Sequence, residues 1–132
     1  MSSLLERYTE EIAEDLKIDQ FNVKEVQMRA PARKHFWVAR LVNAKIKLNA
    51  LKSKKSTLKH EIILRLIERS PTRMTQVAMS NAADNSRELK DIKEAVSDHE
   101  ALVEYLEHVV KIIGSIQWDI KNIIDLMQME MT

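Results

Sequence analysis

The residues of this chain whose chemistry is easiest to interpret are clustered cations with aromatic neighbours. Residues 29–73 hold thirteen Lys and Arg against two Glu, a net charge of +11. Cations that neutralise phosphates release condensed counterions, and an exposed Trp stacks a nucleic-acid base for about 1–3 kcal/mol. The block therefore favours single-stranded nucleic-acid binding. The candidate contacts are Arg33, Lys34, Trp37, Arg40, Lys45, Lys47, Lys52, Lys54, Lys55 and Lys59.

The same residues also fit a plain structural interpretation. A basic helix face can be merely solvated, and Phe36 and Trp37 can be core side chains. For Trp37 taken alone, the core is the favoured interpretation. The net charge of the whole chain is only +1, because residues 1–28 carry −4 and residues 74–132 carry −6. Such asymmetry is a hint of a polyanionic partner.

Other kinds of chemistry are poorly represented in the sequence. There is no Cys and a single Gly, which excludes thiolate zinc sites, disulfides and Gly-rich phosphate loops. No two His lie three or four residues apart, so we expect no metal and no other cofactor. Acid pairs such as Glu104 and Glu107 are ordinary on exposed helices, and we expect no enzyme. The four His are His35, His60, His99 and His108.

The composition predicts an all-α chain in a single helical domain, residues 1–132. A first helix runs to about Leu16, and Asp19 caps a short segment reaching about Arg29. Pro31 starts a helix to about Ser70, 71–85 holds at most a turn or two of helix, and Ser86 opens a last helix weakened at Gly114. Residues 1–73 carry the basic helix, and residues 86–132 carry the oligomerisation helix. No apolar run of about 18 residues is present, so no membrane partner is expected and a cytosolic setting is the default.

The last helix has a heptad pattern. With Leu89 at position a, ten of the twelve a and d positions to Met127 are apolar, and so are the g positions. Two long helices cannot cover three apolar columns, so we expect several copies to associate as a coiled-coil-like bundle or ring. The candidate oligomerisation residues are Val103, Leu106, Val109, Val110, Ile113, Ile116, Ile120, Ile123 and Ile124.

Short motifs at the C-terminus and in the basic helix resemble those of the UvsY family, the recombination mediator proteins of tailed phages. The similarity covers nearly the full length in size and in order of segments. A family motif, Lys-Lys-x-x-Leu-Lys-x-Arg-Leu, is met in part from Lys54 to Lys59, with Glu61 and Ile62 in place of Arg and Leu. The C-terminal aromatic-x-Ile-Lys-x-Ile-x-Asp-Leu pattern is present as Trp118, Ile120, Lys121, Ile123, Asp125 and Leu126.

The resemblance implies a function that could not be inferred from the residues alone. Such mediators form ring-shaped homo-oligomers of six or seven subunits that bind single-stranded DNA in the cytoplasm of the infected bacterial host. They weaken the hold of a single-strand DNA-binding protein and load a RecA-like recombinase in DNA recombination, repair and replication, without catalytic activity. The alternative from the residues alone is a helical coiled-coil scaffold or adaptor whose basic face binds an acidic protein.

Overall fold

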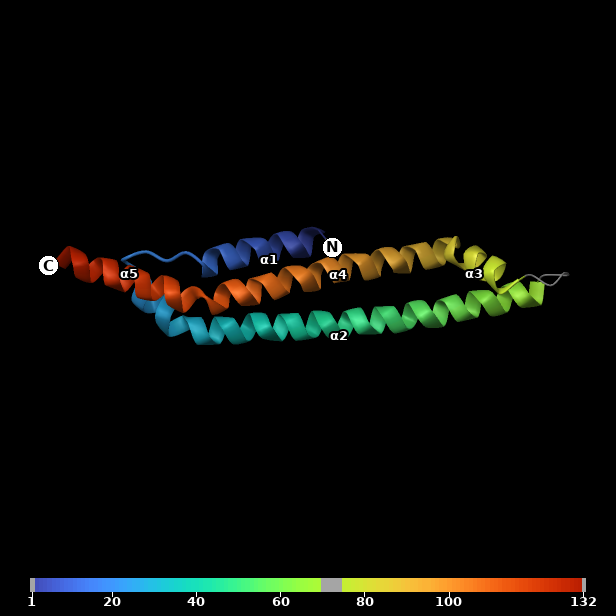
Figure 1. Ribbon diagram of the computed structural model, residues 1–132, viewed down its shortest axis with the longest axis horizontal. Helices are drawn as coiled ribbons and strands as arrows, with labels where there is room; N and C mark the ends of the chain where they lie inside the picture. The colour runs from blue at the N-terminus through green and yellow to red at the C-terminus, as the bar shows by residue number, and fades with distance from the viewer. Residues whose placement is uncertain (1, 70–74, 132) are drawn as a thin grey trace. The chain divides into compact units, whose positions relative to one another are not determined.

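Every regular element in the described part of the chain is an α-helix, which confirms the predicted all-α class. The computed structural model describes residues 2–69 and 75–131. No helix within these residues is long and apolar enough to cross a bilayer. The helices are α1 (Ser2–Asp15), α2 (Val23–Arg69), α3 (Gln76–Asp84), α4 (Arg87–Gly114) and α5 (Ile116–Met131) (Figure 1).

The turn between α1 and α2 is closed by side-chain caps. Asp19 Oδ1 accepts hydrogen bonds from the backbone N–H groups of Phe21 and Asn22, at 2.8 and 3.0 Å. Asn22 Oδ1 accepts in return from the N–H of Asp19 at 2.8 Å. This reciprocal arrangement is the logic of a capping box, and it confirms Asp19 as a cap.

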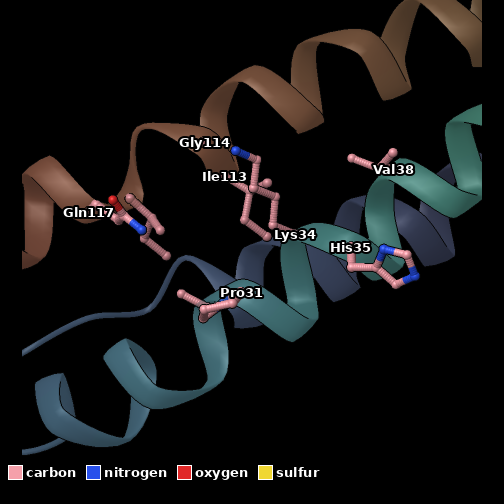
Figure 2. A pocket seen from close by; sticks show the side chains of 9 residues that line it. Pro31, Lys34, His35, Val38, Ile113, Gly114 and Gln117 are labelled. Atoms are coloured by element: carbon pink, nitrogen blue, oxygen red, sulfur yellow. The ribbon is translucent and has the colours of Figure 1, made fainter.

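The prediction that a new helix starts at Pro31 is wrong, because α2 runs through it without interruption. Proline removes one backbone bond and crowds the preceding turn, at a cost of about 3 kcal/mol in a helix interior. Burial of the turns before it offsets this cost, since Val26 and Ala30 are buried against α5. Tertiary packing therefore overrides the local signal. Figure 2 shows Pro31 in the part of α2 where the ribbon changes direction.

The chain from Ser86 onward forms two helices rather than one. Ser86 Oγ accepts from the N–H of Leu89 at 3.3 Å, so its predicted place at the start of this helix is confirmed. At the predicted weak point, Ser115 N–H is shared between the carbonyls of Lys111 and Ile112, at 3.2 and 3.1 Å. Ser115 Oγ also donates to Ile112 O at 2.7 Å. This side-chain competition, beside Gly114, ends α4.

The stretch 71–85 is more helical than predicted in the residues that are described. Residues 70–74 lie outside the described residues, and Gln76–Asp84 form α3. Thr75 caps this helix, because its side chain accepts from the N–H of Ala78 at 3.1 Å. A nine-residue helix thus replaces the expected one or two turns.

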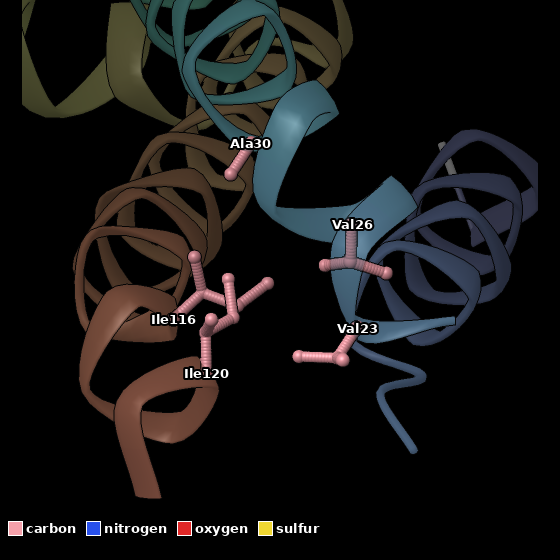
Figure 3. Packing of buried hydrophobic residues seen from close by; sticks show 5 residues of the cluster. All are labelled: Val23, Val26, Ala30, Ile116 and Ile120. Atoms are coloured by element: carbon pink, nitrogen blue, oxygen red, sulfur yellow. The ribbon is translucent and has the colours of Figure 1, made fainter. Parts of the chain in front are cut away.

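The helices divide into two compact units. The first unit contains residues 1–43 and 102–132, and the second contains residues 44–101, so α2 and α4 contribute to both. Each buried Val, Leu or Ile stabilises its unit by about 1.5–3 kcal/mol. In the first unit, one core cluster is Val23, Val26, Ala30, Ile116 and Ile120 (Figure 3). In the second unit, Ile62 of α2 packs with Ala83, Leu89 and Ile92.

The chain itself covers most of the apolar columns that were predicted to meet other copies. The premise that one copy cannot cover this surface is wrong for the buried positions. The first turns of α2, with Leu16 and Ile18 before them, supply part of the cover that a count of two long helices omits. Val110, Ile123 and Ile124 are partly buried. The buried residues of the predicted set are Val103, Leu106, Val109, Ile113, Ile116 and Ile120.

Candidate nucleic-acid interface

Trp37, the aromatic residue predicted to stack a base, lies at the centre of a cluster that joins α1 to α2 in the first unit. Its side chain is fully buried. Its indole Nε1–H donates to Asp15 Oδ2 at 2.8 Å. Arg33 Nε lies 3.0 Å from both Asp15 oxygens, and its Nη2 lies 2.8 Å from Oδ2. One carboxylate thus satisfies the indole and a bidentate guanidinium together.

Arg40 makes a second link between the same two helices. Its guanidinium donates to the Glu11 carboxylate, with Nη1 2.7 Å from Oε2. The same group lies 4.3 Å from the ring centre of Tyr8, 4.1 Å from that of Phe36 and 4.8 Å from that of Trp37. Planar arginine suits such stacking, and cation–π contacts are worth about 0.5–2 kcal/mol.

These contacts correct the predicted roles of three residues. Trp37 does not stack a base, because no part of its ring is accessible; the core interpretation is right. The side chains of Arg33 and Arg40 are 28% and 20% exposed and are paired with carboxylates of α1. Their charge is used within the fold, in pairs with Asp15 and Glu11. The sequence signal for these ion pairs was the presence of two carboxylates, Glu11 and Asp15, one helical turn apart.

The lysines of the second unit lie differently. By helical spacing, Lys45, Lys52 and Lys59 fall on one side of the buried seam of α2, and Lys47 and Lys54 fall on the other. Four of these five are exposed, while Lys59 is intermediate, as is Lys55. In the part of the chain that the structure describes, Lys47 and Lys54 make no ion pair.

Two of these lysines pair with acids of the same unit. Lys52 Nζ lies 4.0 Å from Glu100 Oε1, and both side chains are more than half exposed. Such a surface pair is worth at most about 1 kcal/mol and exchanges easily for another anion. Lys59 is held more firmly, since Asp84 Oδ1 lies 3.2 Å from its Nζ and 3.3 Å from that of Lys93. The hydrogen bonds from Lys59 and Lys93 lower the pKa of Asp84.

A set of apolar side chains remains exposed on α5. Trp118 is 66% exposed, and Leu126 and Met129 are also largely exposed. Lys121 Nζ lies 5.4 Å from the Trp118 ring centre. Large apolar groups at this exposure are candidates for contact with another molecule.

Among residues 2–69 and 75–131, no group of three or more His, Asp or Glu is arranged to hold a metal ion.

Comparison with known proteins finds matches among solved structures. No protein-family model matches the chain, and no curated protein matches it. A crystal structure of the bacteriophage T4 recombination mediator protein UvsY, lattice type IV, superposes with a TM-score of 0.83 and 17% identity, covering 96% of this chain and 98% of that one. The lattice type II structure gives a TM-score of 0.79 at 17% identity, covering 97% and 98%. The resemblance seen in the sequence is therefore confirmed at the level of the fold: this chain folds like the T4 recombination mediator UvsY.

Proposed function

We propose that this chain is a recombination mediator that binds single-stranded DNA, helps to displace a single-strand DNA-binding protein and loads a RecA-like recombinase. It works without catalytic activity, as a homo-oligomer in the cytoplasm of the infected host. The observation that carries the proposal is the likeness of fold, over nearly the whole chain, to a solved recombination mediator. The concentrated positive charge of α2 supports it independently.

The DNA contacts are assigned mainly to the second unit. Arg33, Trp37 and Arg40 are occupied within the first unit, so they are withdrawn from the proposed contacts. Lys47 and Lys54 have the strongest claim, since they are exposed and, among the described residues, have no ion pair to give up. Lys45 and Lys52, on the other side of the seam, and the half-buried Lys55 are proposed to add contacts to the same strand. Each phosphate that is neutralised adds a salt-dependent increment to the affinity.

Self-association multiplies this surface. The exposed side of α5, with Trp118 and Leu126, is proposed as the contact between copies. Repetition of a weak site within one assembly raises avidity by about 10²–10⁴ over a single site. A short row of lysines can then hold a strand against a competing single-strand binder.

The test is fluorescence anisotropy with a labelled single-stranded oligonucleotide at two salt concentrations. Lys47→Gln combined with Lys54→Gln should weaken binding and flatten the salt dependence, by about 0.7 in log–log slope for each phosphate that is no longer neutralised. Lys90→Gln is the matched control, because Lys90 is also an exposed lysine of the second unit but lies on α4, outside the basic block. Unchanged affinity and slope in the double variant would reject the proposal.

An acidic protein is the alternative partner for the same lysines. Lys52 and Lys59 already pair with carboxylates of their own unit, as they would with those of a scaffolded partner. The same titration separates the two functions. An adaptor would bind the oligonucleotide weakly at every salt concentration, whereas the mediator binds tightly at low salt with a steep slope.

A further inference from the structure

A groove in the first unit lies between α2 and the break that joins α4 to α5 (Figure 2). Its volume is about 470 Å³, within the range of about 300–1,000 Å³ typical of small-ligand sites. Pro31 and Val38 of α2 and Ile113 of α4 form apolar walls. In Figure 2 the side chain of Ile113 points toward α2.

The groove lies where the end of α4 faces the turn of α2 that contains Pro31. α4 ends at Gly114, which has no side chain to fill the space, and a Cβ added there would meet no atom within 4 Å. On the opposite wall, α2 continues through Pro31, whose ring nitrogen has no hydrogen to donate to the preceding turn.

The polar residues of the groove are cationic or neutral. Lys34 and His35 are exposed along one side, and Gln117 carries an amide that both donates and accepts. No Asp or Glu is found among the described residues that line the groove. Within the described ranges Lys34 makes no ion pair, so no carboxylate there competes for its charge. The site combines apolar walls, a donor–acceptor amide and an available cation.

A nucleotide has this combination of properties. Its base is flat, with apolar faces and a polar edge, and its phosphate is an anion. We propose that the groove holds one nucleotide of a single strand. The base lies against Pro31 and Val38, Gln117 reaches the base edge, and Lys34 meets the phosphate. The proposal rests on the proposed single-strand binding and adds a base contact in the first unit to the phosphate contacts of the second.

The geometry of Gly114 gives a direct test. Gly114→Leu should fill the groove, while Gly114→Ala adds one methyl group into open space and serves as the matched control. Neither should destabilise the chain, because both residues have higher helix propensity than glycine. We expect Gly114→Leu to weaken oligonucleotide binding about fivefold or more, the loss of one stacked base, and Gly114→Ala to bind like the unaltered chain. Equal binding by both variants would overturn the proposal.

A second measurement locates the base directly. A thymidine oligonucleotide containing 4-thiothymine is crosslinked by light to the unaltered chain, and the attached peptides are identified by mass spectrometry. Crosslinks within 31–38 or 113–117 support the groove, and crosslinks confined to 44–69 refute it while leaving the proposed function intact. Binding of an acidic peptide that Gly114→Leu abolishes, with oligonucleotide binding unaffected, would assign the groove to a protein instead. If the unaltered chain binds no oligonucleotide, the proposed function itself fails.

Discussion

Replacement of Asp15 by alanine should remove the main link between α1 and α2. The carboxylate accepts from Arg33 Nε at 3.0 Å, from Arg33 Nη2 at 2.8 Å and from Trp37 Nε1 at 2.8 Å. Loss of one partner of a buried ion pair costs about 3–5 kcal/mol. Arg33 keeps 28% of its side chain in water, which recovers some of this. We therefore expect Asp15→Ala to lower the free energy of unfolding by about 3 kcal/mol.

The assay is urea unfolding followed by far-UV circular dichroism. Protein concentration must be equal in all samples, because self-association couples the apparent stability to concentration. The midpoint should fall while the slope with urea stays unchanged. Glu14→Ala is the matched control on the same helix. Its ion pair with Lys17, at 2.7 Å, is largely exposed, so we expect a loss of at most about 0.5 kcal/mol.

A loss below about 1 kcal/mol for Asp15→Ala would refute the reasoning, since it would mean that Arg33 and Trp37 find equivalent partners without the carboxylate. A double-mutant cycle with Trp37→Phe isolates the indole–carboxylate bond. We expect a coupling of about 1 kcal/mol between the two substitutions. Strict additivity would show that this bond contributes nothing beyond packing.

Two further predictions concern acid stability and self-association. The pKa of Asp84 is lowered from 3.8, so its stabilising pairs with Lys59 and Lys93 are complete above that pH and are lost as the pH falls through the lowered value. Thermal unfolding from about pH 5 to pH 3 should therefore show a larger fall in Tm for the unaltered chain than for Asp84→Asn; equal falls would contradict this. Trp118→Glu combined with Leu126→Glu should lower the sedimenting mass at micromolar concentration and leave the helical signal intact, because both side chains are exposed. A monomeric unaltered chain would contradict the self-association itself.

Local rules predicted the helix starts at Asp19 and Ser86 but missed the cap that Thr75 gives to α3. Asp19 and Ser86 cap helices because their oxygens reach backbone N–H groups two or three residues away, which depends only on the nearby sequence. Pro31 misled the same rules. The residues before it are buried by α5, which lies more than eighty residues along the chain, and no local pattern contains that contact.

Counting charge along the sequence located the acidic and basic blocks, but it did not predict the ion pairs of Arg33 and Arg40. Division of the chain at residue 28 placed Glu11 and Asp15 in an acidic segment and Arg33 and Arg40 in a basic one. In space these residues neutralise one another, across 18 and 29 residues of sequence. Counting charge by segment cannot detect pairing between segments. The heptad analysis overstated the uncovered surface for a related reason, since it left out the first turns of α2, which pack on Ile116 and Ile120.

The two tryptophans of the chain occupy opposite environments. Trp37 is sealed between α1 and α2, and Trp118 faces solvent on α5. Their fluorescence should therefore differ in two ways. Trp37 should emit at shorter wavelength and be protected from quenching by acrylamide, whereas Trp118 should emit at longer wavelength and be quenched. Phe substitution at either position leaves a single reporter. Trp37 would then record the release of α1, and Trp118 the contact of α5 with another molecule, without an attached dye.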